Sequence, residues 1–201
     1  MDRSAFLIRI GEFEAGIADA LAPERDAVHQ TSSALRAITE DAAAAWLALV
    51  ETGDSRQSGG SLGRRLTQFE AVRLPIPIEL RVSEGYAYYA LFPDTYAAAA
   101  RRFAGDTGVR RVHVVGIRSI GTSLSAVVAA ALRRSGCAVS TSTVRPRGHP
   151  FDRTLQADAR FANSPPPTRS ATAARRERTA GRGIRSAGRW PPVSPPPRSR
   201  G

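Results

Sequence analysis

A short stretch with the sequence GIRSIGTSL, residues 116–124, concentrates glycine, hydroxyl and arginine side chains. Glycines let a backbone approach a ligand closely, hydroxyl groups donate hydrogen bonds, and an arginine adds a charge-assisted contact to a phosphate. A helix that begins at about Ser123 would add free N–H groups and a partial positive charge. The stretch therefore predicts a phosphate or pyrophosphate cradle that includes Gly116, Arg118, Ser119, Gly121, Thr122 and Ser123.

The same composition is also typical of a tight turn between a strand and a helix, with Ser123 as the N-cap, and this alternative remains open. A P-loop is excluded, because Gly121 is followed by Thr122 where that motif requires lysine. All 29 basic residues of the chain are arginines, so chemistry that depends on a lysine amine is excluded as well.

The elements around this stretch predict an α/β domain. Apolar spacing indicates a helix over residues 33–51, capped within Thr31 to Ser33 and stopped by Gly53, and then a surface loop over residues 53–65. Residues 74–93 resemble two strands around a turn, and a helix starts near Pro93. The strand at 109–117, expected to be buried on both faces, the helix after the loop and the strand at 137–146 follow the order of a parallel crossover unit.

The charge of the chain is divided unevenly. Residues 1–158 carry 19 arginines and 17 acidic residues, whereas residues 159–201 carry ten arginines, one acidic residue and eight of the 14 prolines. This composition predicts a disordered tail after a domain over residues 1–158, because the tail has too few apolar residues to offset its ordering entropy. Nonspecific nucleic-acid binding by the tail, with Trp190 as a lone stacking residue, is the weaker alternative, since the tail contains no recognition module.

Cysteine usage and hydropathy predict a cytoplasmic protein without a membrane partner. The single Cys137 cannot form an intramolecular disulfide, and no stretch is long and apolar enough for a signal peptide or a membrane span. Tyr86, Tyr88 and Tyr89 could stack on a base, but packing on the protein is the expected role for such side chains.

The segment RRVHVVGIRSIGTSLSAVVAAAL resembles the first core strand, pyrophosphate loop and following helix of the type I phosphoribosyltransferase superfamily. The stretches YAYYALFPDTYAAAARRF and VRPRGHPFDR extend the resemblance before and after the loop. The resemblance implies a parallel sheet flanked by helices, binding of phosphoribosyl pyrophosphate or a nucleotide, Mg²⁺ as cofactor and a possible homodimer. It implies that the pyrophosphate is held by Arg118, Ser119, Ile120, Gly121, Thr122 and Ser123.

The resemblance also gives residues 145–153 a functional interpretation. In this superfamily a flexible loop at that place closes over a phosphorylated substrate, which makes Arg147, His149 and Arg153 candidate phosphate contacts. The alternative is a solvated turn set by Pro146, Gly148 and Pro150.

The chain departs from the family in one respect. The acidic ribose-phosphate motif that should follow the strand at 137–146 has no counterpart after Asp158, so the ribose hydroxyls lack their usual carboxylate partners. Two expectations follow: a binding or sensing module without catalysis is the alternative to an active transferase, and the true reading frame is lost near residue 158, which leaves the sheet incomplete.

Overall fold

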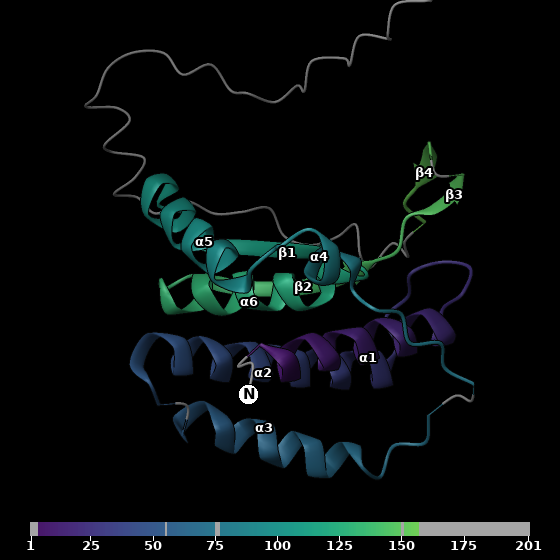
Figure 1. Cartoon of the computed structure of the whole chain (residues 1–201), viewed down its shortest axis with the longest axis horizontal. Coiled ribbons are helices and arrows are strands. Elements are labelled where there is room, and N and C mark those ends of the chain that lie inside the picture. Colours follow the sequence, from purple (N-terminus) through teal and green to yellow (C-terminus); the bar gives the residue numbers. More distant parts are fainter. Residues whose placement is uncertain (1–3, 55, 75–76, 150, 157–201) are drawn as a thin grey trace, which may run out of the picture.

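The computed structural model describes residues 4–54, 56–74, 77–149 and 151–156, which form a mixed α/β arrangement with a small parallel sheet. The helices lie in layers: α6 (Ile120–Arg134) lies against the sheet with α5 (Pro93–Thr107) packed on it, and α1 (Ala5–Leu21), α2 (Gln30–Thr52) and α3 (Arg56–Phe69) are stacked below α6 in Figure 1. The expected tail at 159–201 and the expected domain boundary at residue 158 lie outside these residues. Within the described part, no helix is long and apolar enough to cross a membrane.

Two long helices form the N-terminal layer, α1 (Ala5–Leu21) and α2 (Gln30–Thr52). The sequence indicates α2 but gives no expectation for α1. The helix α2 begins one turn earlier than expected, because the ring Nδ1 of His29 accepts a hydrogen bond from the Thr31 N–H and serves as the N-cap. Gly53 ends the helix as predicted, in the left-handed conformation at φ 74° that glycine favours.

The expected surface loop at 53–65 is wrong, because α3 (Arg56–Phe69) occupies most of it. Leu62, Leu66 and Phe69 recur at helical spacing and pack against the buried cluster of Ile17, Leu35 and Ile38. Glycine and serine disfavour a helix in isolation, but burial of an apolar stripe outweighs that propensity here.

The expected pair of strands within residues 74–93 is also wrong. This region holds one short helix, α4 (Glu84–Tyr88), and Leu74 and residues 77–82 have no regular structure. Ile78 packs against the same buried cluster as α3. The carbonyl oxygen of Glu79 lies so close to α1 that a Cβ on Gly16 would be only 2.7 Å from that oxygen. The segment crosses a helix rather than pairing with a strand, so its alternating apolar residues do not form a sheet.

The strand, helix and strand around the polar stretch form as predicted. They are β1 (Arg111–Ile117), α6 (Ile120–Arg134) and β2 (Ala138–Val144), and β1 and β2 pair in parallel from Arg111 opposite Ala138 to Ile117 opposite Val144. The helix α5 (Pro93–Thr107) precedes them, with Pro93 in its first turn as expected.

Among the described residues, helices cover the sheet on one face only. Val115 is 50% exposed and Ile117 is 61% exposed, so the expectation that this strand is buried on both faces is wrong. Parallel strands are usually buried on both faces, and this pair has α6 on one side.

The segment expected to be a polar connection, residues 145–153, contains a small hairpin, and Pro150 lies outside the described residues. Its strands are β3 (Arg147–His149) and β4 (Asp152–Thr154), paired antiparallel. The hairpin projects from the end of β2, beyond the α4 end of the molecule (Figure 1).

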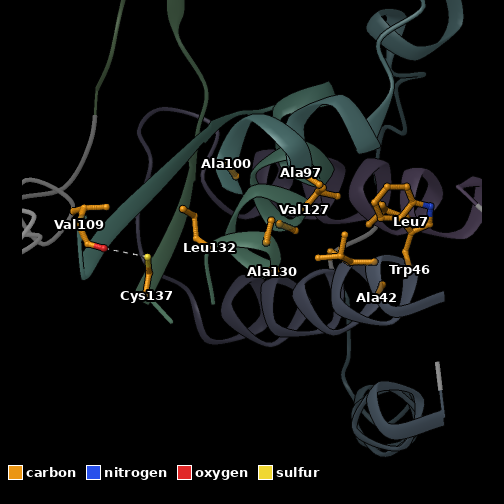
Figure 2. Close-up of a cluster of buried hydrophobic side chains, with 14 residues drawn as sticks. Leu7, Ala42, Trp46, Ala97, Ala100, Val109, Val127, Ala130, Leu132 and Cys137 are labelled. Atoms are coloured by element: carbon orange, nitrogen blue, oxygen red, sulfur yellow. Dashed lines mark hydrogen bonds between the residues drawn. The ribbon is translucent and has the colours of Figure 1, made fainter. Parts of the chain in front are cut away.

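The core lies where α6 meets its neighbours. Alanines from α2, α5 and α6, among them Ala42, Ala97 and Ala130, let these helices approach closely, and Leu7 and Trp46 close one end of the cluster (Figure 2). At the other end the Sγ of Cys137 donates to the Val109 carbonyl at 3.3 Å. Leu124, Val127 and Leu132 of α6 are buried in this region.

Candidate functional site

The polar stretch forms a very short loop between β1 and α6. Only Arg118 and Ser119 lie between the end of the strand and Ile120, where the helix begins three residues earlier than expected. The N–H of Arg118 donates to the Val144 carbonyl at 2.7 Å, which ties the loop to the carboxyl end of β2. The loop thus lies at the edge of the sheet where ligands bind in open parallel sheets.

Ser119 adopts a backbone conformation that is rare for residues other than glycine. Its φ is 111° and its ψ is −121°. Such strain persists only where the surrounding structure imposes it, and it is concentrated at functional sites in many proteins. In this chain it turns the backbone from the strand into the helix within two residues.

The glycines of the stretch serve the packing of the strand on the helix. A Cβ on Gly116 would overlap the carbonyl of Gly121, and one on Gly121 would lie 3.3 Å from the Gly116 carbonyl carbon. The glycines therefore allow β1 and α6 to approach each other closely, as expected for a tight turn between a strand and a helix.

The first turn of α6 is covered by α1 and α4. Thr122 and Ser123 are buried, and a Cβ on Gly11 of α1 would lie 2.9 Å from the Ser123 Cβ. The hydroxyl of Tyr86 on α4 lies 2.8 Å from the Ser123 Oγ, and burial raises the Tyr86 pKa to about 12. These contacts occupy the hydroxyl of Ser123 within the protein.

Arg118 is directed into the protein. Its side chain is 4% exposed; Nε lies 3.1 Å from the Asp19 Oδ1, and Nη2 forms an ion pair with Asp26. Burial lowers the Arg118 pKa to about 10, although the charge of Asp19 opposes that shift. In this conformation the guanidinium joins the loop to α1 and to the α1–α2 connection.

Two of the predicted site residues, Ser119 and Arg153, line the same cavity, which has a volume of about 260 Å³. Arg145, the first residue after β2, lies beside them, and Arg81 comes from the segment that crosses α1. Arg145 pairs with Asp19 and Arg81 with Glu79, whereas Arg153 has no ion-pair partner in the described part of the chain. The acidic residues at the cavity are Glu12, Asp19, Glu79 and Glu84.

Arg147 and His149 lie apart from that cavity. The Arg147 guanidinium donates to the carbonyls of Ala22 and Pro23 at 2.8 Å and 2.9 Å, and so attaches the hairpin to the end of α1. It lines a broader cavity of about 810 Å³ near Arg81 and Arg145. The exposed His149 ring is 5.6 Å from the Phe151 ring.

Sequence patterns did not indicate Arg81, nor two buried residues further from the loop, Glu14 and Arg36. The side chain of Arg36 donates to the Thr141 and Ser125 hydroxyls and to the Thr122 carbonyl, at 2.7 to 3.0 Å. For Arg36, the available signal was a charged residue among the apolar side chains of the predicted buried face of α2. Among the described residues, no group of three histidine, cysteine, aspartate or glutamate side chains is placed to hold a metal ion.

Comparison with known proteins identifies no relative: no protein-family model matches the chain, and no curated protein and no solved structure is significantly similar to it.

Proposed function

We propose that the chain is a phosphoribosyltransferase-like protein that binds phosphoribosyl pyrophosphate, or a nucleotide phosphate, beside the β1–α6 loop. The observation that carries this proposal is the cavity lined by Ser119, Arg145 and Arg153 at the carboxyl ends of two parallel strands. That edge is the general binding place in open parallel sheets, and a hydroxyl with two guanidinium groups is a donor set suited to phosphate.

The contacts that these residues make in the structure suggest a different role for each in binding the anion. Arg153 is exposed on β4 and can turn toward an anion without losing an ion pair in the described structure, whereas Arg145 would share its charge between Asp19 and the ligand. Ser119 would add its hydroxyl at the start of α6, where the helix dipole favours negative charge. These groups would hold the pyrophosphate and stabilise the charge that it gains on leaving the ribose.

The Mg²⁺ that the family resemblance implies has no matching group of side chains in the described residues. No described residue of this chain is therefore proposed as a ligand of the ion. The binding experiment includes it because a metal ion can also be carried to a site by the phosphates of the ligand.

Calorimetric titration with phosphoribosyl pyrophosphate, with and without Mg²⁺, tests the proposal. We expect binding that weakens about tenfold in Arg153→Ala and in Ser119→Gly, which removes the hydroxyl and suits the positive φ. Arg102→Ala is the matched control, since Arg102 is an exposed arginine of α5 outside this cavity. Absence of binding, or equal binding by all four proteins, would overturn the proposal.

A second measurement separates a transferase from a binding module. Release of pyrophosphate in the presence of a panel of bases would identify an active enzyme. Binding without release would favour a sensing or partner-binding role, which agrees with the missing acidic motif and with the burial of Thr122 and Ser123.

A further inference from the structure

The parallel sheet carries a histidine whose two ring nitrogens both contact serine hydroxyls. The Nδ1 of His113 on β1 lies 2.8 Å from the Ser140 Oγ, and its Nε2 lies 2.9 Å from the Ser142 Oγ, with both serines on β2. Side chains alternate between the two faces of a strand, so His113 lies on the same face of β1 as the exposed Val115 and Ile117. We call this face, which no described helix covers, the open face.

The two serines on this ring cannot play the same part, because a neutral imidazole donates through one nitrogen and accepts through the other. One hydroxyl accepts the ring N–H and fixes the orientation of the ring, while the other donates its O–H to the nitrogen that carries no proton. A hydroxyl bonded to a base that is itself oriented by a third group is the arrangement that activates the hydroxyl for attack. Burial lowers the pKa of His113, which favours the neutral ring that can accept a proton.

The neighbours of the two serines distinguish them. Ser142 is paired with Val115 in the register of the sheet, and Ile117 follows on the same face, so apolar surface lies beside Ser142. A short acyl chain can lie on these two side chains while its carbonyl carbon is next to the Ser142 hydroxyl. Ser140 has no such surface opposite it, because it is paired with His113 itself. The geometry therefore favours Ser142 as the nucleophile and Ser140 as the group that orients the ring.

The backbone around Ser142 limits the reactivity that this arrangement can reach. The N–H groups and carbonyls that lie between β1 and β2 are used in the parallel ladder, so they are not free to stabilise an oxyanion beside the serine. A substrate must then bring a good leaving group of its own, as an activated ester does. The side chains that flank the serine on the open face carry no charge, which favours a neutral acyl group.

We propose that the open face hydrolyses activated esters of short apolar acids, with Ser142 as the nucleophile, His113 as the base and Ser140 as a positioning residue. The His113 Nε2 takes the hydroxyl proton of Ser142 while Oγ forms a bond to the ester carbonyl carbon. The bond from that carbon to the leaving oxygen breaks, and the imidazolium gives its proton to the leaving oxygen or to water. Water then attacks the acyl group and gives a proton to Nε2. The bond to Oγ breaks and Oγ regains the proton, which leaves a carboxylic acid and an alcohol.

Release of nitrophenol from p-nitrophenyl acetate by the full-length protein tests this inference. We expect an initial burst from acylation of a single serine in each chain, followed by slower turnover. Peptide mass spectrometry of the quenched reaction should then find the acetyl group on Ser142. The same protein unfolded in urea gives the background rate of unstructured side chains. Release no faster than that background, or acetylation at another residue, would overturn the inference.

Variants separate the nucleophile, the base and the positioning residue. Ser142→Ala and His113→Gln should each lower the rate of nitrophenol release by about 100-fold, since glutamine keeps hydrogen-bonding atoms but cannot take up the proton. Ser140→Ala should lower the rate less, and Ser140→Thr, which restores the hydroxyl, should recover it. Ser135→Ala, at the end of α6, is the matched control and should react as the wild type does. Wild-type rates in Ser142→Ala or in His113→Gln would contradict the assignment.

The pH dependence of acylation distinguishes a base from a histidine that only packs on the sheet. The side chains that β2 presents to His113 are the uncharged Ser140 and Ser142, Arg111 is the charged residue on its own side of β1, and α6 packs on the opposite face. The rate should rise as His113 loses its proton and become constant above a pKa at or below the usual histidine value of about 6.5. A rate that rises steadily to about pH 9 would show attack by hydroxide and would contradict the role of His113.

Discussion

At the scale of single residues, the glycines of the β1–α6 unit are explained by contact between backbones. A Cβ on Gly116 would overlap the carbonyl of Gly121, which cannot move without shifting the start of α6. Gly105 on α5 offers the contrast, because a Cβ there meets nothing within 4 Å. The free space around each glycine therefore decides whether its replacement by alanine lowers or raises the free energy of unfolding.

We expect Gly116→Ala to lower the free energy of unfolding by about 1–3 kcal/mol, the usual cost of overpacking. Gly105→Ala should raise it by about 0.5–1 kcal/mol, because alanine is the better helix former. Urea denaturation of both variants and of the wild type measures the difference. Equal effects of the two substitutions would show that β1 and α6 do not touch at Gly116.

Glu14 should make stability depend on pH in an unusual direction for a carboxyl group. Because burial in the folded protein holds the Glu14 pKa above its usual value, the folded chain binds this proton more tightly than the unfolded chain. The contribution of Glu14 is therefore complete below the unfolded pKa and is lost as pH rises through the folded pKa.

Glu14→Gln removes this titration while keeping the shape of the side chain. We expect the free energy of unfolding of the variant, relative to wild type, to increase as pH rises from about 4 to about 8. Denaturation series across this range measure it. A difference that stays constant with pH would show that Glu14 has the same pKa in both states.

At the scale of elements, the helices and strands that are determined by the pattern of nearby residues were predictable from the sequence. The spacing of apolar residues indicated α2, α5 and α6, and Gly53 and Pro93 marked a helix end and a helix start. The strands β1 and β2 were equally clear, because both are rich in β-branched residues and a predicted helix separates them.

The elements that the sequence did not indicate depend on distant contacts. The helix α3 is rich in glycine and serine and is stabilised by packing of Leu62 and Leu66 under α1 and α2. In the candidate site, the position of the loop was likewise predictable, because it follows from β1 and α6, whereas the direction of one side chain was not. The inward direction of Arg118 depends on Asp19 and Asp26, about 100 residues away in sequence, and no local pattern contains that information.

The weak intrinsic propensity of α3 gives a test of its packing. Gly60 and Gly63 are helical, and a Cβ at either meets nothing within 4 Å. Gly60→Ala and Gly63→Ala should each raise the free energy of unfolding by about 0.5–1 kcal/mol. Leu66→Ala, which removes a partly buried contact with the same cluster, should lower it; thermal unfolding of the three variants checks both signs.

At the scale of the whole molecule, Asp26 joins parts of the chain that are far apart in sequence. It is 1% exposed and lies between α1 and α2, where it forms ion pairs with Arg118 and Arg147. Its Oδ2 also accepts the Arg145 N–H at 2.8 Å. One carboxylate thus connects the loop after β1, the end of β2 and the hairpin.

Asp26→Asn should therefore destabilise the protein as a whole. Removing one partner from a buried ion pair leaves the other charge uncompensated, which costs about 3–5 kcal/mol. Asp152→Asn is the control, since Asp152 is an exposed aspartate on β4. Chemical denaturation of the two variants should show a large loss for the first and little change for the second; similar losses would mean that Asp26 is accessible to water.

The position of Asp26 also bears on the order of events while the chain is being made. A ribosome delivers α1 and α2 first, but the cations that neutralise Asp26 belong to residues 118–147. Until those residues emerge, water must remain around this carboxylate, and the α1–α2 connection cannot close over it. Completion of the N-terminal layer therefore waits until residues 118–147 have been made, and a chain released before Arg118 would lack every group that neutralises this carboxylate.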